Sequence, residues 1–502
     1  MTSLLNAPSS TSDLEGPDPK RWLALGIVAI AQLMVVLDAS IVTIALPSAQ
    51  HSLHISTGNR QWIITAYTLA FGGLLLLGGR ISDYIGRKRA FIIGLLGFAA
   101  ASALGGIAVS SGMLFGARAL QGAFAALLAP AALSLITVTF TDVKERATAF
   151  GVYGAISGGG AAIGLILGGV LTEFASWRWT LLVNVPIAIV TALAAVPVVR
   201  ESRAHGNTSY DIPGALSITL GLVSLVYGFS KAEQDGWASS PTVTFLLIAV
   251  GLLVAFVVIE LKSKNPLLPM RIILERTRGG SYLASFLTGA GLMGMFLFLT
   301  YYFQGSLHYS ALKSGFAFLP FSAGIIVAAG VAARILPKVG PRSIMTVGLS
   351  VASLGMFWLT KIGVHTSYAA HVLPGEILIS LGIGLAFVAL SSTALHGVGD
   401  HDAGVASAMV NTTQQVGGSL GTALLNTLAA SATLAYVGSH APGAATVAAG
   451  QVHGYSVGAL VGGILLAVAA VAAFILVKAG RHDVALSEAV AEPLAVPASA
   501  AG

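Results

Sequence analysis

The chain has 502 residues, of which 55% are apolar, 9% are charged and 60 are glycine. This composition excludes a soluble globular protein and predicts a polytopic membrane protein. The sequence contains no cysteine, which excludes disulfides, thiolate nucleophiles and cysteine-bound metals. The net charge of +6 comes from basic residues scattered through short loops, and this distribution indicates membrane topology rather than nucleic-acid binding.

The first twenty residues are polar, and the apolar stretch after them is too long for the core of a signal peptide. We therefore expect the first span to remain in the protein as a membrane helix. About twenty apolar residues are needed to cross about 30 Å of hydrocarbon as a helix. Fourteen stretches meet this requirement, at residues 22–47, 61–81, 90–109, 112–138, 147–172, 179–199, 211–230, 241–261, 280–303, 315–336, 342–361, 371–395, 404–432 and 455–478.

The lysines and arginines predict which side of the membrane each loop faces. An even number of spans puts both termini on one side. With that side cytoplasmic, twenty of the 26 basic residues fall at inner positions, five at outer positions and one, Arg118, inside a span. We therefore predict a protein of the cytoplasmic membrane with both termini in the cytoplasm, because one span more or fewer would reverse every later loop.

Two inner loops of similar sequence indicate an internal repeat. Residues 80–88 read RISDYIGRK and residues 334–342 read RILPKVGPR, so that arginine, isoleucine and glycine are in register. Many transporters are built from such repeats, with the binding site between the halves. We predict an all-α membrane protein with a cytoplasmic N-terminal tail (1–21), a six-helix bundle (22–200), two extra transmembrane helices (201–262), a cytoplasmic linker (263–279), a second six-helix bundle (280–478) and a cytoplasmic C-terminal tail (479–502).

Three ionisable residues lie inside predicted spans. At 1.5 Å per residue, Asp38 lies about 13 Å below the outer end of the first span, Arg118 about 9 Å inside the fourth and Glu376 about 8 Å inside the twelfth. A charge near the bilayer centre costs roughly 2.5–3.5 kcal/mol even on lenient insertion scales. We therefore predict that these residues couple transport to proton movement. The alternative is a static ion pair between Asp38 and Arg118 that holds helices together.

Helix movement could switch Asp38 between two protonation states. Burial in hydrocarbon favours the protonated acid, whereas a nearby guanidinium favours the carboxylate. A shift of a few ångströms between the helices that carry Asp38 and Arg118 would decide which effect is larger.

The inner loop after the second span carries the most specific motif. Gly79 and Gly86 allow close helix approach and a tight turn. Asp83, Arg87 and Lys88 can pair with each other or with the ends of neighbouring helices. We predict that this loop is a conformational switch.

Amides and glycines recur inside the spans. Amides in membrane helices more often join helices than contact a substrate, but five are candidates for lining the substrate cavity: Gln121, Asn184, Gln304, Asn411 and Gln415. Small residues at helical spacing allow helix backbones to touch. They occur in the fifth span at Gly154, Gly158, Gly159, Gly160, Gly164, Gly168 and Gly169, with a counterpart in the thirteenth at Gly417, Gly418 and Gly421.

Several motifs occur together along the chain: Asp38 with Ile41-Val42 and Ala45-Leu46-Pro47, the loop at 79–88, Arg118-x-x-Gln121-Gly122, the glycine-rich fifth span, and Trp177-Arg178-Trp179 with Asn184-Val185-Pro186. In combination they resemble the major facilitator superfamily, and with fourteen spans the chain is similar to its multidrug:proton antiporter family. The resemblance implies a major facilitator fold, with Asp38 as a protonation site and Arg118 as its coupling partner. Gly164-Leu165 stands where the antiporter motif commonly has Gly-Pro.

We therefore predict export of lipophilic drugs or metabolites, cationic ones included, against proton entry by alternating access, with antibiotic resistance as a consequence. Glu376 is predicted to bind a cationic substrate or a second proton. The alternative is a symporter that takes up a small solute with protons, and the scarcity of charged and amide groups in the spans argues against it.

We do not expect an enzyme. The histidines lie in loops, tails or near span ends, and no nucleotide-binding loop occurs. We therefore predict no catalytic residue, no metal site, no cofactor and no nucleic-acid partner. The expected partners are protons, a lipophilic substrate and the lipid bilayer, and the expected state is a monomer.

Overall fold

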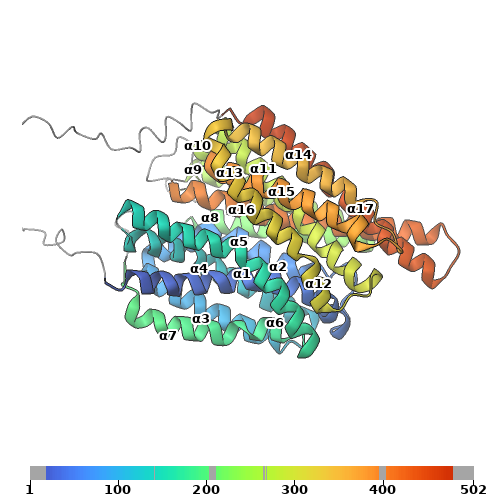
Figure 1. Cartoon of the computed structure of the whole chain (residues 1–502), viewed down its shortest axis with the longest axis horizontal. Coiled ribbons are helices and arrows are strands. Elements are labelled where there is room, and N and C mark those ends of the chain that lie inside the picture. The colour runs from blue at the N-terminus through green and yellow to red at the C-terminus, as the bar shows by residue number, and fades with distance from the viewer. Residues whose placement is uncertain are drawn as a thin grey trace, which may run out of the picture.

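A computed structural model of the chain describes residues 19–478, apart from 141, 203–210, 264, 265, 267, 269 and 395–402. The described residues are helical almost throughout (Figure 1). The C-terminal tail, most of the N-terminal tail and part of the predicted linker lie outside the described residues.

The first group of helices precedes residue 200 and comprises α1 (Arg21–Ser52), α2 (Trp62–Ile85), α3 (Arg87–Gly106), α4 (Ser111–Thr139), α5 (Val143–Phe174), α6 (Trp179–Leu182) and α7 (Asn184–Val198). Within this group α1 packs on α5, α4 packs on α2 and α3, and α3 packs on α7. The short α6 leads into α7, and together they form one apolar segment, Trp179–Val198. This packing brings α1, α3, α4 and α7 around a common core.

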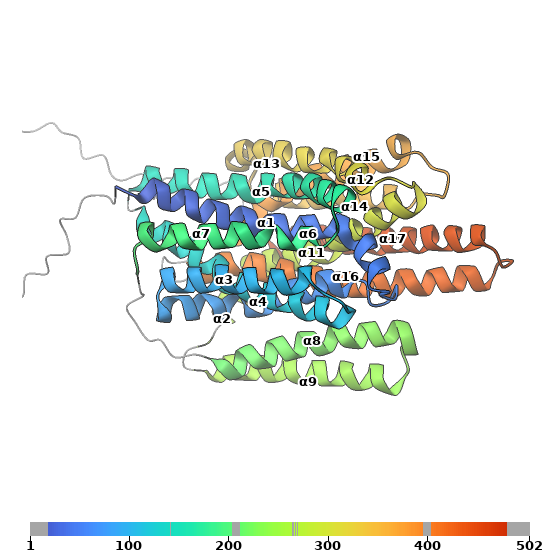
Figure 2. The ribbon, with the colours of Figure 1, turned by 90° about the horizontal axis from the view of Figure 1, so that it is seen from below.

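A hairpin of two helices, α8 (Ile212–Asp235) and α9 (Ser240–Lys262), follows. Both helices lie at the side of the bundle (Figure 2). Asp211 caps α8, since its Oδ1 accepts the Gly214 backbone N–H at 2.8 Å, which satisfies a donor at the helix start. On its inner face α8 packs against α2 of the first group and α16 of the second.

The second group comprises α10 (Met270–Ile273), α11 (Arg276–Tyr301), the π-helical turn η1 (Tyr302–Ser306), α12 (Ala311–Ala317), α13 (Leu319–Val339), α14 (Pro341–Leu359), the π-helical turn η2 (Tyr368–Val372), α15 (Leu373–Ala394), α16 (Ala403–Gly438) and α17 (Ala444–Leu476). Here α11 packs on α16 and α17, and α15 packs on α13 and α14. The two groups meet where α2 contacts α16 and where α5 contacts α12 and α13.

The predicted repeat is visible in the turns of the two groups. Gly86 ends α2 with φ of 105°, and Gly340 ends α13 with φ of 86°. Both angles are in the region that glycine adopts at little cost and other residues avoid. The two similar inner loops of the sequence therefore make the same kind of tight turn between consecutive long helices.

The glycine-rich faces also correspond. Gly164 and Gly168 of α5 press against α1 at Ser40 and Ile41, where an added Cβ would collide. Gly417 and Gly421 of α16 press in the same way against α11, at Phe286 and Ala290. The interpretation of these glycines as close helix contacts is confirmed.

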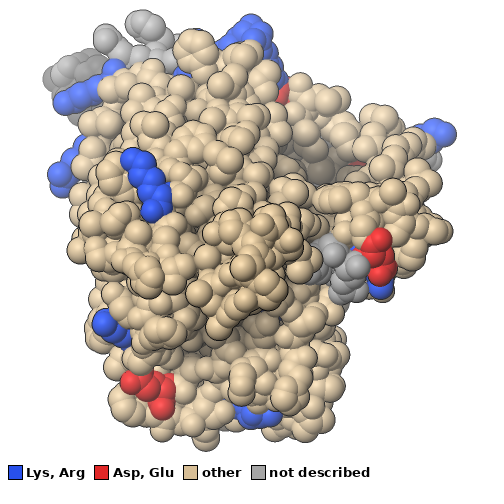
Figure 3. All heavy atoms as spheres, turned by 90° about the vertical axis from the view of Figure 1, so that its right-hand side faces the viewer, with Lys and Arg blue, Asp and Glu red and all other residues tan. Residues whose placement is uncertain are grey.

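Twelve of the predicted spans coincide with helices that are long and apolar enough to cross a bilayer, among the residues described. The two exceptions, 61–81 and 147–172, fall on α2 and α5. Among the described residues, these two helices contain the apolar stretches Trp62–Leu75 and Gly160–Phe174. Both α8 and α9 are among the twelve. The end of the molecule at which α12 and α6 lie, the predicted outer end, carries only scattered charged side chains (Figure 3).

Candidate functional site: two buried acids

Asp38 lies in the middle of α1 with no exposed surface. Its Oδ2 accepts a hydrogen bond from Arg118 Nη1 at 2.6 Å. Its Oδ1 accepts two more, from Gln121 Nε2 at 2.9 Å and from Asn184 Nδ2 at 2.8 Å. The predicted contact between Asp38 and Arg118 is therefore present, and three donors hold the carboxylate.

Arg118 is equally buried on α4, with 1% of its surface exposed. Its Nε donates to the Ile63 carbonyl at 2.9 Å and its Nη1 also reaches Gln121 Oε1 at 2.9 Å. The guanidinium carbon lies 4.5 Å from the centre of the Tyr67 ring, a distance suited to a cation–π contact. The hydrogen bonds and this ring contact thus compensate the free-energy cost of burying the cation.

We call Asp38, Ser102, Arg118, Gln121 and Asn184 the Asp38 network. Gln121 completes it by donating to Ser102 Oγ at 2.7 Å. The network joins α1, α3, α4 and α7, all in the first group of helices. It can hold these helices together as an ion pair would, and it can also release its carboxylate if α1 moves against α4.

The other predicted cavity residues occupy different places. Gln121 and Asn184 are fully buried and bind Asp38, which is the helix-joining role that amides more often have. Gln304, at η1, donates to the Ile44 carbonyl of α1 at 2.9 Å. Asn411 is exposed, and Gln415 is partly buried beside Gly72. Substrate contact by these residues stays a prediction.

Glu376 is the second fully buried acid and lies in the first turn of α15. Its Oε2 is 3.1 Å from the Tyr368 hydroxyl of η2, and its Oε1 has no hydrogen-bond partner. The Tyr368 ring packs against Phe303 of η1, with ring centres 5.9 Å apart. Unlike Asp38, Glu376 forms no ion pair among the described residues.

The two acids are in different helix groups and are not brought together. Asp38 belongs to the first group and Glu376 to the second, in α15, which packs on α13 and α14. Arg118 and Glu376 were predicted at similar depths in the membrane, but they belong to two separate sites. Any coupling between them has to pass through the contacts between the helix groups.

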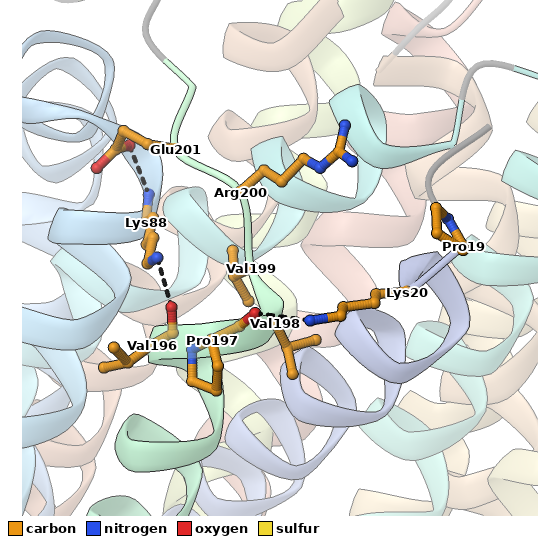
Figure 4. Close-up of a pocket in the computed structure, with 9 residues that line it drawn as sticks. All are labelled: Pro19, Lys20, Lys88, Val196, Pro197, Val198, Val199, Arg200 and Glu201. Atoms are coloured by element: carbon orange, nitrogen blue, oxygen red, sulfur yellow. Dashed lines mark hydrogen bonds between the residues drawn. The ribbon is translucent and has the colours of Figure 1, made fainter. Parts of the chain in front are cut away.

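The predicted switch loop binds the end of α7. The Arg87 backbone N–H donates to the Ser202 carbonyl at 2.9 Å, and the Lys88 N–H donates to Glu201 Oε1 at 3.1 Å. Lys88 Nζ also donates to the Val196 carbonyl at 2.6 Å, as Figure 4 shows. A cation at a helix C-terminus is favourable because the carbonyls there carry partial negative charge.

Figure 4 shows that the same end of α7 also receives Lys20, whose Nζ donates to the Pro197 carbonyl at 3.3 Å. These residues line a shallow hollow at the predicted inner end. The side chain of Asp83 lies outside the described part of the chain. The switch role of Gly79, Asp83, Gly86, Arg87 and Lys88 therefore stays a prediction.

The close helix approach predicted at Gly79 occurs one residue earlier. A Cβ at Gly78 would overlap the Ala126 carbonyl of α4, whereas a Cβ at Gly79 would make an ordinary contact with Pro130 at 3.5 Å. The prediction for Gly79 was wrong by one position, because the rotation of α2 about its axis determines which glycine faces α4. Gly86 makes the predicted tight turn.

An ion pair at the predicted inner end joins α1 to α5. Arg21 Nε and Nη2 each lie 2.8 Å from a carboxylate oxygen of Glu145. Glu145 precedes the predicted span at 147. Its hydrogen bonds to the Arg21 guanidinium lower the pKa of the carboxyl, because they favour its charged form.

Sequence reasoning missed a contact between the two helix groups at the predicted outer end. Arg60, counted there only as an outer cation, is buried with its guanidinium 4.0 Å from the centre of the Tyr301 ring. Its Nε donates to Asn426 Oδ1 at 3.2 Å, and Asn426 Nδ2 donates to Gln61 Oε1 at 2.8 Å. We call Arg60, Gln61, Tyr301 and Asn426 the outer contact.

A second link at this end joins α5 to α12. The Leu312 N–H, in the first turn of α12, donates to Glu173 Oε2 at 2.9 Å. Together with the bond from Gln304 to α1, these contacts hold the outer ends of the groups together. One feature of the sequence could have indicated the role of Arg60 in this contact: it is a basic residue immediately before an apolar helix on the predicted outer side.

Among the described residues, no three His, Cys, Asp or Glu side chains cluster as metal ligands would. The Asp38 network is instead closed by hydrogen bonds among its own members.

Comparison with known proteins decides the family. The sequence matches the Major Facilitator Superfamily over residues 28–422. The chain belongs to this superfamily. The puromycin resistance protein pur8 of Streptomyces alboniger is a relative of this major facilitator, 50% identical over 474 residues that cover 94% of each chain. The cephamycin export protein CmcT of Amycolatopsis lactamdurans is 39% identical over 82% of this chain and 85% of its own length.

A solved structure supports the same fold. It is a bacterial homologue of the human lysosomal transporter Spinster, in an inward-facing and unoccupied conformation. It matches this major facilitator with a TM-score of 0.67 over 93% of this chain and 99% of its own, at 14% identity. Membership of the superfamily makes the chain a multi-pass membrane transporter and not an enzyme.

Proposed function

We propose that this major facilitator exports lipophilic drugs or antibiotics from the cell and that proton entry drives the export. The observation that carries the proposal is the 50% identity to a puromycin resistance protein over 94% of both chains. The 39% identity to a cephamycin export protein supports the same direction of transport. Puromycin is therefore the substrate of choice for a first test.

For the membrane arrangement, we propose that α2 and α5 also cross the bilayer, which gives fourteen spans. Two six-helix bundles are then separated by the α8–α9 hairpin, and both termini lie in the cytoplasm. The support is the distribution of basic residues, twenty of which fall at inner positions in this arrangement. We propose that the transporter works as a monomer.

For coupling, we propose that Asp38 and Arg118 respond to protons, with Glu376 as a second ionisable group. Leaving an unpaired charge in a protein interior costs about 3–5 kcal/mol, so Arg118 needs a partner whenever Asp38 takes a proton. Gln121, the Ile63 carbonyl and the Tyr67 ring are in place to stabilise it. The loop at 79–88 would reset its contacts with α7 as the helix groups rock.

The test uses everted membrane vesicles from cells that express the chain, so that the cytoplasmic face is outside. With the interior acid, we expect puromycin to accumulate inside, and a protonophore should abolish the accumulation. Vesicles without the transporter are the control. Proton-driven puromycin uptake into right-side-out vesicles, with none into everted ones, would instead support the symporter alternative.

The coupling residue is tested with Asp38→Asn in the same vesicles. Asparagine carries no charge, and we expect at least tenfold slower accumulation driven by the pH gradient. Asp235→Asn is a matched control, because Asp235 is an exposed acid at the end of α8, 3.4 Å from Lys231. The amount of each variant in the membrane is measured alongside. Full proton-driven export by Asp38→Asn would refute the assignment.

A further inference from the structure

The hydrogen bonds around Glu376 indicate the protonation state of this acid. The Tyr368 hydroxyl oxygen lies 2.7 Å from the Ala317 carbonyl oxygen and 3.1 Å from Glu376 Oε2. A phenol has one hydrogen, and a backbone carbonyl can only accept. The shorter contact therefore takes the phenol hydrogen, and the contact with Glu376 needs a hydrogen that the carboxyl supplies.

The surroundings of Glu376 favour the neutral acid as well. The side chain is fully buried, Oε1 has no hydrogen-bond partner and no ion pair reaches it among the described residues. A carboxylate there would lose its hydration without compensation, which is far more costly than burying a neutral acid. On the side of Tyr368, the aromatic ring of Phe303 packs on Tyr368 and on Phe318.

Nearby titratable groups do not change this conclusion. Tyr309 stacks on Phe303, which also contacts the Tyr368 ring, and Lys313 Nζ lies 3.9 Å from the centre of the Tyr309 ring. His371 lies in η2, one turn before Glu376, and its Nδ1 has no hydrogen-bond partner. The charged side chains on described helices that pack on α15 are at the opposite, inner ends of those helices: Arg276, Arg278, Arg334, Lys338 and Arg342.

We infer that Glu376 carries a proton in this conformation while Asp38 is ionised, so that the Glu376–Tyr368 pair is the occupied proton site. This inference rests on the proposed proton-driven export and assigns the proton to one of its two acids. Asp38 accepts three hydrogen bonds, one of them from a cation, and these donors stabilise its carboxylate form. Glu376 is as deeply buried and has none of these donors.

The same contacts suggest how the proton reaches Glu376 from the outer side. Ala317 ends α12, and α12 packs on α5 of the other helix group. When the groups separate at the outer end, α12 can carry the Ala317 carbonyl away from Tyr368. The phenol hydrogen then turns to Glu376 and stabilises the carboxylate, which takes a proton from the water of the outer side. When the outer end closes again, the phenol hydrogen returns to the Ala317 carbonyl and the protonated acid donates to the phenol oxygen, as seen here. Tyr368 keeps its own hydrogen throughout.

The ring contact between Phe303 and Tyr368 joins two π-helical turns. Phe303 belongs to η1 and Tyr368 to η2, and the two rings touch. Such turns are rare and frequently occur at functional sites. In this position they place an aromatic pair between the helix-group contact at α12 and the buried acid of α15.

Infrared difference spectroscopy on the purified full chain tests the protonation state directly. We expect a pH titration to show the C=O stretch of a buried protonated carboxylic acid, and Glu376→Gln should remove it. Asp38→Asn and the exposed-acid control Asp235→Asn should leave it in place. A band that survives Glu376→Gln, or that disappears in Asp38→Asn, would overturn the inference.

Tyr368→Phe provides a second variant that loses only a hydroxyl. The carboxyl would then have no acceptor, and its C=O band should shift to the higher frequency of an acid without hydrogen bonds. An unchanged band would contradict the pairing. This result does not depend on whether Glu376→Gln folds.

Vesicle transport separates this inference from the proposed function. If Glu376 carries one of the coupled protons, Glu376→Gln should lower the maximum puromycin gradient about tenfold per imposed pH unit, since one proton moved down one pH unit is equivalent to a tenfold concentration ratio. If puromycin accumulation by the unaltered chain does not depend on the pH gradient, the proposed function fails. If that chain responds and Glu376→Gln reaches the same gradient, this inference fails.

Discussion

At the scale of single residues, the two buried acids show how partners determine the state of a carboxyl group. Asp38 and Glu376 are both fully buried in helices. Asp38 has an arginine and two amides around it, whereas Glu376 has one phenol that is already committed to a carbonyl. Burial alone therefore does not define the role of an acid in a membrane helix, and the donors around it do.

The Asp38 network predicts a cost for removing one donor. In Asn184→Ala the carboxylate keeps Arg118 and Gln121 but loses the 2.8 Å bond from Nδ2. Hydrogen bonds to charged groups contribute about 1.5–3 kcal/mol, so we expect clear destabilisation in thermal unfolding of the detergent-solubilised protein. Gln50→Ala, which loses a bond to the Ile55 carbonyl, should cost about 0.5–1.5 kcal/mol. Equal losses would contradict a charged Asp38.

Two neighbouring glycines give a second prediction at this scale. Gly78→Ala places a methyl group against the Ala126 carbonyl and should separate α2 from α4, with loss of stability and transport. Gly79→Ala has room beside Pro130 and should leave unfolding temperature and puromycin export nearly unchanged. If Gly79→Ala is the more damaging of the two, the rotation of α2 described here is wrong.

At the scale of helices, the contacts between the two groups concentrate polar side chains at the predicted outer end. Arg60, Gln61 and Asn426 join the loop before α2 to α16, and Glu173 joins α5 to α12. Polar contacts of this kind can be broken and re-formed more readily than the glycine-lined contacts of α5 with α1 and of α16 with α11. Alternating access requires such a separable seam, and the outer contact is suited to form it.

The outer contact can be tested by labelling, because the chain contains no cysteine. Ser314→Cys introduces one thiol in α12, where Ser314 is fully buried. Adding Arg60→Gln removes the cation from the Tyr301 ring and should raise the rate of labelling by a membrane-impermeant maleimide from outside severalfold. The rate is followed in intact cells.

Arg178→Gln is the matched control for that experiment. Arg178 is also an outer arginine on an aromatic ring, 4.6 Å from the centre of Trp177, but its hydrogen bond reaches the Ala108 carbonyl within the first helix group. We expect no change in labelling with this substitution. Equal effects of Arg60→Gln and Arg178→Gln would show that Arg60 does not hold the two groups together.

At the scale of the whole molecule, the α8–α9 hairpin lies against both helix groups at once. Val226 of α8 packs among Leu69 of α2 and Leu420 and Ala423 of α16. Thr427 of α16 also donates to the Phe229 carbonyl at 3.1 Å. The hairpin therefore covers the seam between α2 and α16, while the seam between α5 and α13 has no such cover among the described helices (Figure 2).

Removing the hairpin tests the topology of the whole chain. Deleting α8 and α9 together keeps the number of spans even, so a fluorescent reporter at the C-terminus should stay cytoplasmic. Lipid can replace the lost contacts at little cost, because its chains are as apolar as leucine. Deleting α9 alone should reverse or scramble the second group. A reporter that moves outside in the double deletion would contradict the fourteen-span arrangement.

The sequence by itself determined the class of protein, the positions of most spans and the need for the buried charges of Asp38 and Arg118 to be stabilised. These conclusions depend on local composition and on the cost of charge in hydrocarbon, which each segment carries with it. The same local signals predicted the turn at Gly86, because glycine tolerates that backbone wherever the turn occurs.

Only the tertiary structure decided which side chains complete each site. Asp38 is 80 residues from Arg118 and 146 from Asn184, so their contacts depend on how separate helices are rotated and packed. A rotation of about 100° per residue also separates Gly78 from Gly79. Arg60 and Tyr368 gain their importance in the same way, since each acquires its partners from helices that approach it only when the chain is folded.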